Sequence, residues 1–172
     1  MKLPLAARKN FRENPNSYSP ASSIRMACEL ENLINANAWE VRFDFSLKNT
    51  PKNDVDVIDL MNEFFKSFST EKRFTKEFSG LRWTGVYVPE TLNPKTSSPN
   101  PHTHGLIKFF RKGNTIKAIV ESLQSIANVS KNFKEGTSHV RELSEGENPS
   151  SYFTSHVGDF LVLTKGSKGF NL

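Results

Sequence analysis

A run of strictly alternating residues between Trp39 and Leu47 constrains the fold more than any other stretch of this chain. Large apolar side chains occupy every second position and are separated by charged or polar ones, in the order Trp-Glu-Val-Arg-Phe-Asp-Phe-Ser-Leu. Because successive side chains of a strand project to opposite faces of a sheet, this alternation predicts a strand with one buried and one more polar face. The turn-forming residues 48–53 end it.

Three stretches carry apolar residues at helical spacing. The first begins at Pro20, which Ser19 can cap, and ends near residues 35–37. The second begins at Asn53 or Asp54, and the third at Asn114 or Thr115. Two more strands are predicted at residues 81–90 and 102–110, joined as a hairpin through a Pro-, Ser-, Thr- and Asn-rich loop, and a short fourth strand and a last short helix follow at 137–143 and 150–157.

After the leading helix, the order of elements is strand, helix, strand, strand, helix, strand, helix. This order predicts an α+β fold of the ferredoxin-like, split β-α-β kind, with an antiparallel sheet and helices packed against it. Three segments are predicted along the chain: a basic N-terminal arm or loop at 1–20, the folded domain at 21–160 and a C-terminal tail at 161–172.

The composition bounds the class of protein. With 172 residues, 36% of them hydrophobic, the chain is long enough to bury a core as one domain. The net charge of +5 suits a polyanionic partner. The single cysteine, Cys28, excludes an internal disulfide and a cysteine-based zinc site, and its apolar helical neighbours predict burial. No apolar run approaches the ~20 residues of a membrane span, and no signal-peptide core is present, so we expect a cytoplasmic protein without a membrane partner.

His102 and His104 alternate with Thr103 ahead of an apolar run. In a strand, this spacing puts both imidazoles on one face, where their ring nitrogens could hold one divalent metal ion. The alternative is a pair of half-exposed polar residues with no ligand.

Three features together resemble the HUH endonuclease superfamily, and within it the initiators of rolling-circle replication. The first predicted strand ends in Phe-Ser-Leu-Lys-Asn at 45–49, the third carries His102-Thr103-His104, and the last helix carries Tyr152. The resemblance covers roughly residues 39–157 in the family's order. The chain departs from the family at Thr103, where an apolar residue is usual, and after Tyr152, where Ser155 and His156 replace the expected lysine.

The resemblance implies metal-dependent nicking and joining of single-stranded DNA through a 5′-phosphotyrosine intermediate. Tyr152 is then the nucleophile, with His156 one helical turn away as its helper. His102 and His104 bind Mg²⁺ or Mn²⁺, which neutralises charge on the phosphate. The alternatives are a half-buried Tyr152 in a helix and a structural or exposed His156.

A third, acidic ligand is expected from the neighbouring strand. If residues 81–90 and 102–110 pair as a simple hairpin, Glu90 lies opposite His102, Val88 lies opposite His104, and Glu90 shares the histidines' face. A solvated carboxylate is the alternative for Glu90. Asp44 and Glu40 are weaker candidates for this ligand, and His139 is interpreted as a surface residue. The expected DNA contacts are Lys48, Asn49, Lys108 and Arg111.

The implied partner is single-stranded DNA or an origin hairpin, and a role for a host helicase stays open. The implied setting is a bacterial or archaeal cell carrying a plasmid or virus that encodes the protein. Two alternatives remain: a single-tyrosine HUH transposase, which shares these motifs, and a non-catalytic single-stranded nucleic-acid-binding module, which shares the topology but needs no metal. A phosphoesterase with paired His-x-Thr/Ser motifs would need a second such motif, which the sequence lacks.

Overall fold

A computed structural model of the chain describes residues 10, 13, 14, 16, 23–49, 54–70, 82–92, 99–110, 115–147, 149, 162 and 163. The chain divides into two compact units, one formed by residues 1–38 with 144–160 and the other by residues 39–143 with 161–172. The predicted boundaries at residues 20 and 160 both fall outside the described residues.

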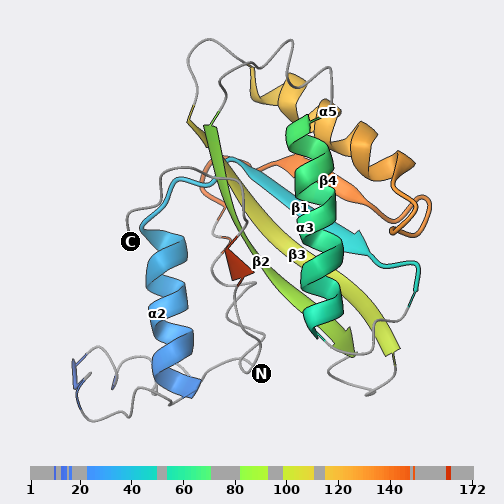
Figure 1. The fold of residues 1–172 in the computed structure, drawn as a ribbon. Coiled ribbons are helices and arrows are strands. Elements are labelled where there is room, and N and C mark those ends of the chain that lie inside the picture. The colour runs from blue at the N-terminus through green and yellow to red at the C-terminus, as the bar shows by residue number, and fades with distance from the viewer. Residues whose placement is uncertain are drawn as a thin grey trace. The chain divides into compact units, whose positions relative to one another are not determined.

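The second unit contains an antiparallel sheet in the order β4-β1-β3-β2-β5 (Figure 1). Its elements along the chain are β1 (Val41–Ser46), α3 (Asp54–Thr70), β2 (Arg82–Leu92), β3 (Pro99–Phe110), α5 (Ile116–Val129), β4 (His139–Glu142) and β5 (Val162–Leu163). The order β4-β1-β3-β2 with two helices is the predicted α+β, ferredoxin-like arrangement, which the structure confirms.

One face of the sheet and one side of each of α3 and α5 form the hydrophobic core. β1 alternates between buried and half-buried residues along its length, as its sequence predicts. Its buried side chains, including Phe43 and Phe45, join one cluster with those of α3, such as Phe65, and of α5, such as Leu123. Both helices therefore cover the same face, which we call the core face; Figure 1 shows α3 and α5 on one side of the sheet.

β2 and β3 form the predicted hairpin, and both strands are longer than the sequence indicated. The register places Glu90 opposite His102 and Val88 opposite His104, as predicted, and it shifts between Glu90 and Leu92. The strands extend to Leu92 and back to Pro99, so part of the stretch predicted as loop is paired strand. The polar and proline-rich composition between the two strands predicts a loop. Pairing with a long partner strand can override such weak strand propensity, and this is why the strands extend into it.

β4 is a short edge strand held from both sides. It pairs with β1 on one side. On the other, the side-chain amide of Gln124 in α5 donates to the carbonyl of Ser138 at 2.8 Å and accepts from the backbone N–H of Val140 at 2.7 Å. This side chain satisfies backbone groups that an edge strand otherwise exposes.

β5 was absent from the sequence prediction, which treated residues 161–172 as a tail. Val162 and Leu163 pair antiparallel with Tyr87 and Val86 of β2. Two residues are too few to show an alternating pattern, so only the pairing with β2 identifies them as a strand. The helix predicted at 150–157 lies outside the described residues.

In the first unit, α2 (Ser23–Asn35) ends where predicted, and its predicted start at Pro20 lies outside the described residues. Its Cys28 is buried, as its apolar neighbours indicated. Within the part of the chain that the structure describes, no helix is long and apolar enough to cross a bilayer.

Candidate functional site

The two histidines lie side by side on the face of the sheet opposite the core face. His102 and His104 are half-buried, whereas Thr103 between them is fully buried. The ring centroids of the histidines are 4.7 Å apart and the ring planes are nearly perpendicular, at 84°. The predicted sharing of one face is confirmed. We call this side of the sheet the histidine face.

Thr103, the residue between the two histidines, faces the core although its side chain is polar. Its side chain is 0% exposed on the core face, opposite Phe45. Its hydroxyl donates a hydrogen bond to the carbonyl of Val88 at 3.1 Å. A buried hydroxyl costs little once it is hydrogen-bonded, so threonine can fill the position of an apolar residue.

His104 has a carboxylate partner that comes from β1. Asp44 lies directly opposite His104 in the strand register, and its Oδ1 contacts Nδ1 of His104. Arg42, two residues away on the same face, donates from Nε and Nη2 to the same carboxylate at 2.9 and 3.0 Å. Asp44 thus links an imidazole and a guanidinium group.

The pKa of Asp44 reflects this double pairing. Burial by itself would raise the pKa, but the hydrogen bonds and positive charges of His104 and Arg42 outweigh burial and hold the pKa below its ordinary value. Asp44 is therefore ionised at neutral pH. An ionised carboxylate only accepts hydrogen bonds, so Nδ1 of His104 carries the proton that it donates to Asp44.

Nδ1 of His102 is fixed in the same way, by a backbone group. It contacts the carbonyl oxygen of Asn100. A carbonyl oxygen only accepts, so this nitrogen also carries the proton. In the neutral form of each ring, the lone pair then resides on Nε2. Histidines that bind metals show this arrangement, with the second ring nitrogen donating to a carboxylate or a carbonyl.

The acidic candidates for a third ligand differ in position. Glu90 lies opposite His102 in the register, while its side chain lies outside what the structure describes. Glu40 accepts a hydrogen bond from the backbone N–H of Phe109 at 2.8 Å. Among the described residues, no group of three or more His, Cys, Asp or Glu side chains is placed to hold a metal ion.

Of the predicted DNA contacts, two follow the end of β1 and one lies on β3. Lys48 and Asn49 are exposed just after β1, where Leu47 bridges to Phe133 and the backbone N–H of Lys48 donates to Asn132. Lys108 follows His104 by four residues in β3, and its Nζ lies 5.5 Å from the centre of the Phe110 ring. Arg111 lies outside the described residues.

The structure narrows the choice of a tyrosine nucleophile. Tyr87 pairs with Gly105, which puts its side chain on the core face, away from the histidines. It is 0% exposed. Burial, and to a smaller extent the negative charge of Asp59, raises the pKa of its phenol. A buried phenol with a raised pKa on the wrong face cannot serve as the nucleophile. Tyr18, Tyr152 and His156 lie outside the described residues.

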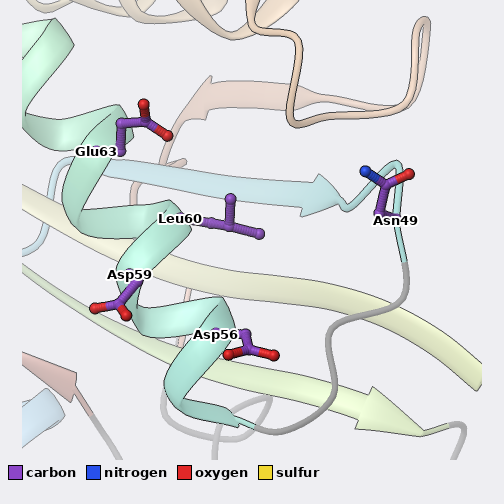
Figure 2. Close-up of a pocket in the computed structure, with 5 residues that line it drawn as sticks. All are labelled: Asn49, Asp56, Asp59, Leu60 and Glu63. Atoms are coloured by element: carbon purple, nitrogen blue, oxygen red, sulfur yellow. The ribbon is translucent and has the colours of Figure 1, made fainter.

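A pocket of about 370 Å³ lies beside α3, away from the histidine face. It is lined by Asn49, Asp56, Asp59, Leu60 and Glu63. Figure 2 shows Asp56 and Leu60 on the side of α3 nearest Asn49, whereas Asp59 points to the opposite side. Three carboxylates around an open pocket repel a polyanion, so this pocket does not suit a nucleic-acid backbone.

Asp44 is the residue whose role sequence reasoning missed. Its alternating position indicated the polar face of β1, and it was considered only as a weaker third ligand. The signal that could have found its role is the pairing of β1 with β3, which no local pattern encodes.

Comparison of the sequence with protein-family models and with curated proteins, and of the fold with solved structures, gave no match.

Proposed function

We propose that this protein is a metal-dependent nickase and joining enzyme for single-stranded DNA of the HUH type, acting in the initiation of rolling-circle replication of a plasmid or phage. The observation that carries the proposal is the orientation of the histidine pair. Each Nδ1 is held by an acceptor, Asp44 or the carbonyl of Asn100, so both rings present Nε2 as the nitrogen with a lone pair.

The donor set fits a divalent ion with open coordination positions. His102 and His104 would supply two neutral imidazoles, and Glu90 is the residue placed opposite His102 from which a carboxylate would come. Bound there, Mg²⁺ or Mn²⁺ would polarise the scissile phosphate and neutralise the charge that develops on its oxygens. Asp44 would keep the His104 ring in the orientation and tautomer that binding requires.

The nucleophile in this proposal is the phenolic oxygen of Tyr152. It attacks the phosphorus, the bond from phosphorus to the 3′ oxygen breaks, and a 5′-phosphotyrosine and a free 3′-hydroxyl result. His156 takes up the phenol proton and then donates it to the departing 3′ oxygen, which becomes the 3′-hydroxyl. Joining is the reverse reaction, in which a 3′-hydroxyl attacks the phosphotyrosine.

The non-catalytic binding module is less well supported. RNA-recognition modules of this topology stack bases on aromatic side chains of the sheet face that the helices leave open. Here both aromatic residues of β1, Phe43 and Phe45, and one of the two in β3, Phe109, belong to the core. The described part of the histidine face instead carries imidazole, carboxylate and guanidinium groups, with Phe110 as an exposed ring at the end of β3.

The deciding experiment is incubation with a pool of single-stranded oligonucleotides and Mn²⁺, read by denaturing gel and mass spectrometry. We expect a covalent adduct on Tyr152 that disappears with a chelator, in Tyr152→Phe and in the double variant His102→Ala/His104→Ala. Tyr87→Phe is the matched control and should keep the adduct, because Tyr87 lies on the core face. An adduct that survives Tyr152→Phe would overturn the nucleophile, and binding indifferent to metal and to every variant would favour the passive module.

A further inference from the structure

The segment that follows α5 runs antiparallel to the end of β1. Leu47 and Phe133 form an isolated bridge between the two. Next to this bridge, the backbone N–H of Lys134 donates to the carbonyl of Ser46 at 2.9 Å. Lys134 is therefore held directly beside the last residue of β1, on the side of β1 that faces away from β3.

Lys134 lies on the histidine face. The residue before it, Phe133, belongs to the core, where its ring centroid is 4.5 Å from that of Phe45. Because successive side chains of an extended segment project to opposite faces, Lys134 projects to the face that carries the histidines. Lys134 is exposed, in agreement with this orientation.

Lys134 is aligned with His102 across the sheet. Ser46 lies opposite His102 in the register of β1 and β3, and Lys134 lies on the other side of Ser46. The outer two backbones are two strand spacings apart, about 10 Å, and the flexible four-carbon stem of a lysine covers much of this distance. In the next row, the carboxylate of Asp44 contacts His104, whereas Ser46 carries only a hydroxyl. An ammonium group can therefore approach His102 past Ser46 without passing a carboxylate.

Lys48 adds a second positive charge at the same corner. It is exposed and follows the buried Leu47, so it continues the polar side of β1. Among the described residues, no carboxylate forms an ion pair with Lys48 or Lys134. Glu135, the carboxylate nearest to Lys134 in the sequence, is exposed to solvent. Two ammonium groups at one end of β1 favour an anion beside them.

The acidic pocket beside α3 bounds this basic corner. Asn49, the residue after Lys48, lines the pocket together with three carboxylates, those of Asp56, Asp59 and Glu63 (Figure 2). Carboxylates repel a polyanion. A nucleic-acid strand that contacts Lys48 is therefore favoured on the side of the histidines and disfavoured on the side of the pocket.

We infer that Lys134 contacts a phosphate of the single-stranded DNA next to the one that reacts at the histidine pair, with Lys48 beside it. This inference rests on the proposed function and identifies a residue that positions its substrate. Lys134 lies outside the sequence motifs, and only the bridge to β1 brings it to the site. A phosphate contact of this kind fixes the register of the DNA without reading its sequence.

The test is binding of a fluorescent 20-nucleotide single strand of mixed sequence, measured by anisotropy in a chelator across a series of salt concentrations. We expect Lys134→Ala to weaken binding about two- to fivefold, the range of one exposed ion pair. The slope of log affinity against log salt should fall by about 0.7, the value of one phosphate contact on a single strand. Lys134→Glu should weaken binding further, and Lys134→Arg, which keeps the charge, should retain it.

A second measurement tests whether the contact lies beside the histidines. In Mn²⁺, Lys134→Ala should weaken binding less when it is combined with His102→Ala/His104→Ala than when it is made alone. The reason is that the histidine variant no longer holds the strand where Lys134 can reach it. Strictly additive losses would overturn the placement of Lys134 next to the reacting phosphate.

Lys117→Ala is the matched control, because Lys117 is an exposed lysine on α5, which covers the core face. The inference is overturned if Lys134→Ala binds with the affinity and salt slope of the original protein, or if Lys117→Ala lowers both equally. Binding in a chelator needs no cleavage and so separates the two proposals. An adduct on Tyr152 with no effect of Lys134→Ala overturns the contact alone, whereas a loss in Lys134→Ala without any adduct overturns the nickase alone.

Discussion

Asp44 and His104 face each other across β1 and β3, and the carboxylate holds the imidazole by its Nδ1 atom. The two residues are 60 positions apart in the chain. Arg42 binds the same carboxylate from the neighbouring position on β1. This relationship turns a His-x-His spacing, which many strands carry, into an oriented pair of potential metal ligands.

Replacing Asp44 by asparagine should weaken metal binding. Asparagine nearly preserves the shape of the side chain but removes the charge that holds Nδ1–H of His104, and loss of such an outer partner typically costs about 10- to 100-fold in metal affinity. Titration calorimetry with Mn²⁺ measures the effect. Asp59→Asn, an exposed carboxylate on α3, is the control and should bind as the original protein does. Equal affinity in Asp44→Asn would show that Asp44 does not support a metal ligand.

Gly105 should not tolerate a side chain. It lies opposite Phe43, and a Cβ atom at this position would come within 1.9 Å of Cζ of the phenyl ring. We expect Gly105→Ala to lower the free energy of unfolding by about 1–3 kcal/mol, as overpacking of a core does. Adding Phe43→Leu should recover part of this loss, and a double-mutant cycle from urea unfolding measures the coupling. Strictly additive effects would contradict the steric explanation.

Replacing Tyr87 by phenylalanine should stabilise the fold. Its hydroxyl is buried and has no hydrogen-bond partner among the described residues, which costs about 1–3 kcal/mol. We therefore expect Tyr87→Phe to raise the free energy of unfolding by about 1 kcal/mol at neutral pH. A loss of stability would indicate that the hydroxyl has a partner.

The difference in the free energy of unfolding between the original protein and Tyr87→Phe should grow at high pH. The pKa of Tyr87 is raised by burial and by Asp59, so above pH about 10 the unfolded chain loses this proton before the folded one does. Stability that is present below that pH is then lost as the pH rises, by up to about 1.4 kcal/mol per pH unit. Urea unfolding at pH 8 and pH 11 should show the advantage of Tyr87→Phe growing, and a constant difference would contradict it.

Gln124 should stabilise β4 through its two backbone hydrogen bonds. We expect Gln124→Ala to cost about 1–2 kcal/mol, because the groups at Ser138 and Val140 lose their partners. Amide hydrogen exchange at Val140 should accelerate as well. Asn128→Ala removes only the bond from Gln124 Nε2 to Asn128 Oδ1, at 2.7 Å, and is the control. Unchanged exchange at Val140 in Gln124→Ala would show that β1 alone holds the strand.

Much of the fold could be predicted from the sequence because the signals are local. Alternation identified β1, helical spacing identified α3 and α5, and the order of elements indicated the ferredoxin-like sheet. The opposition of Glu90 and His102 could also be predicted, since a hairpin joins consecutive strands and links their registers. The extended hairpin and β5 could not be predicted, because long-range pairing decided them.

The sequence by itself determined that His102 and His104 share a face, because the two-residue period of a strand is a property of the backbone. It also determined that Asp44 and Arg42 lie on the polar side of β1. Only the tertiary structure decided that Asp44 meets His104 and that Arg141 meets Arg42. These strands are not consecutive, so no turn sets their register. Packing of Phe43 over Gly105 and of the helices on the core face sets it instead.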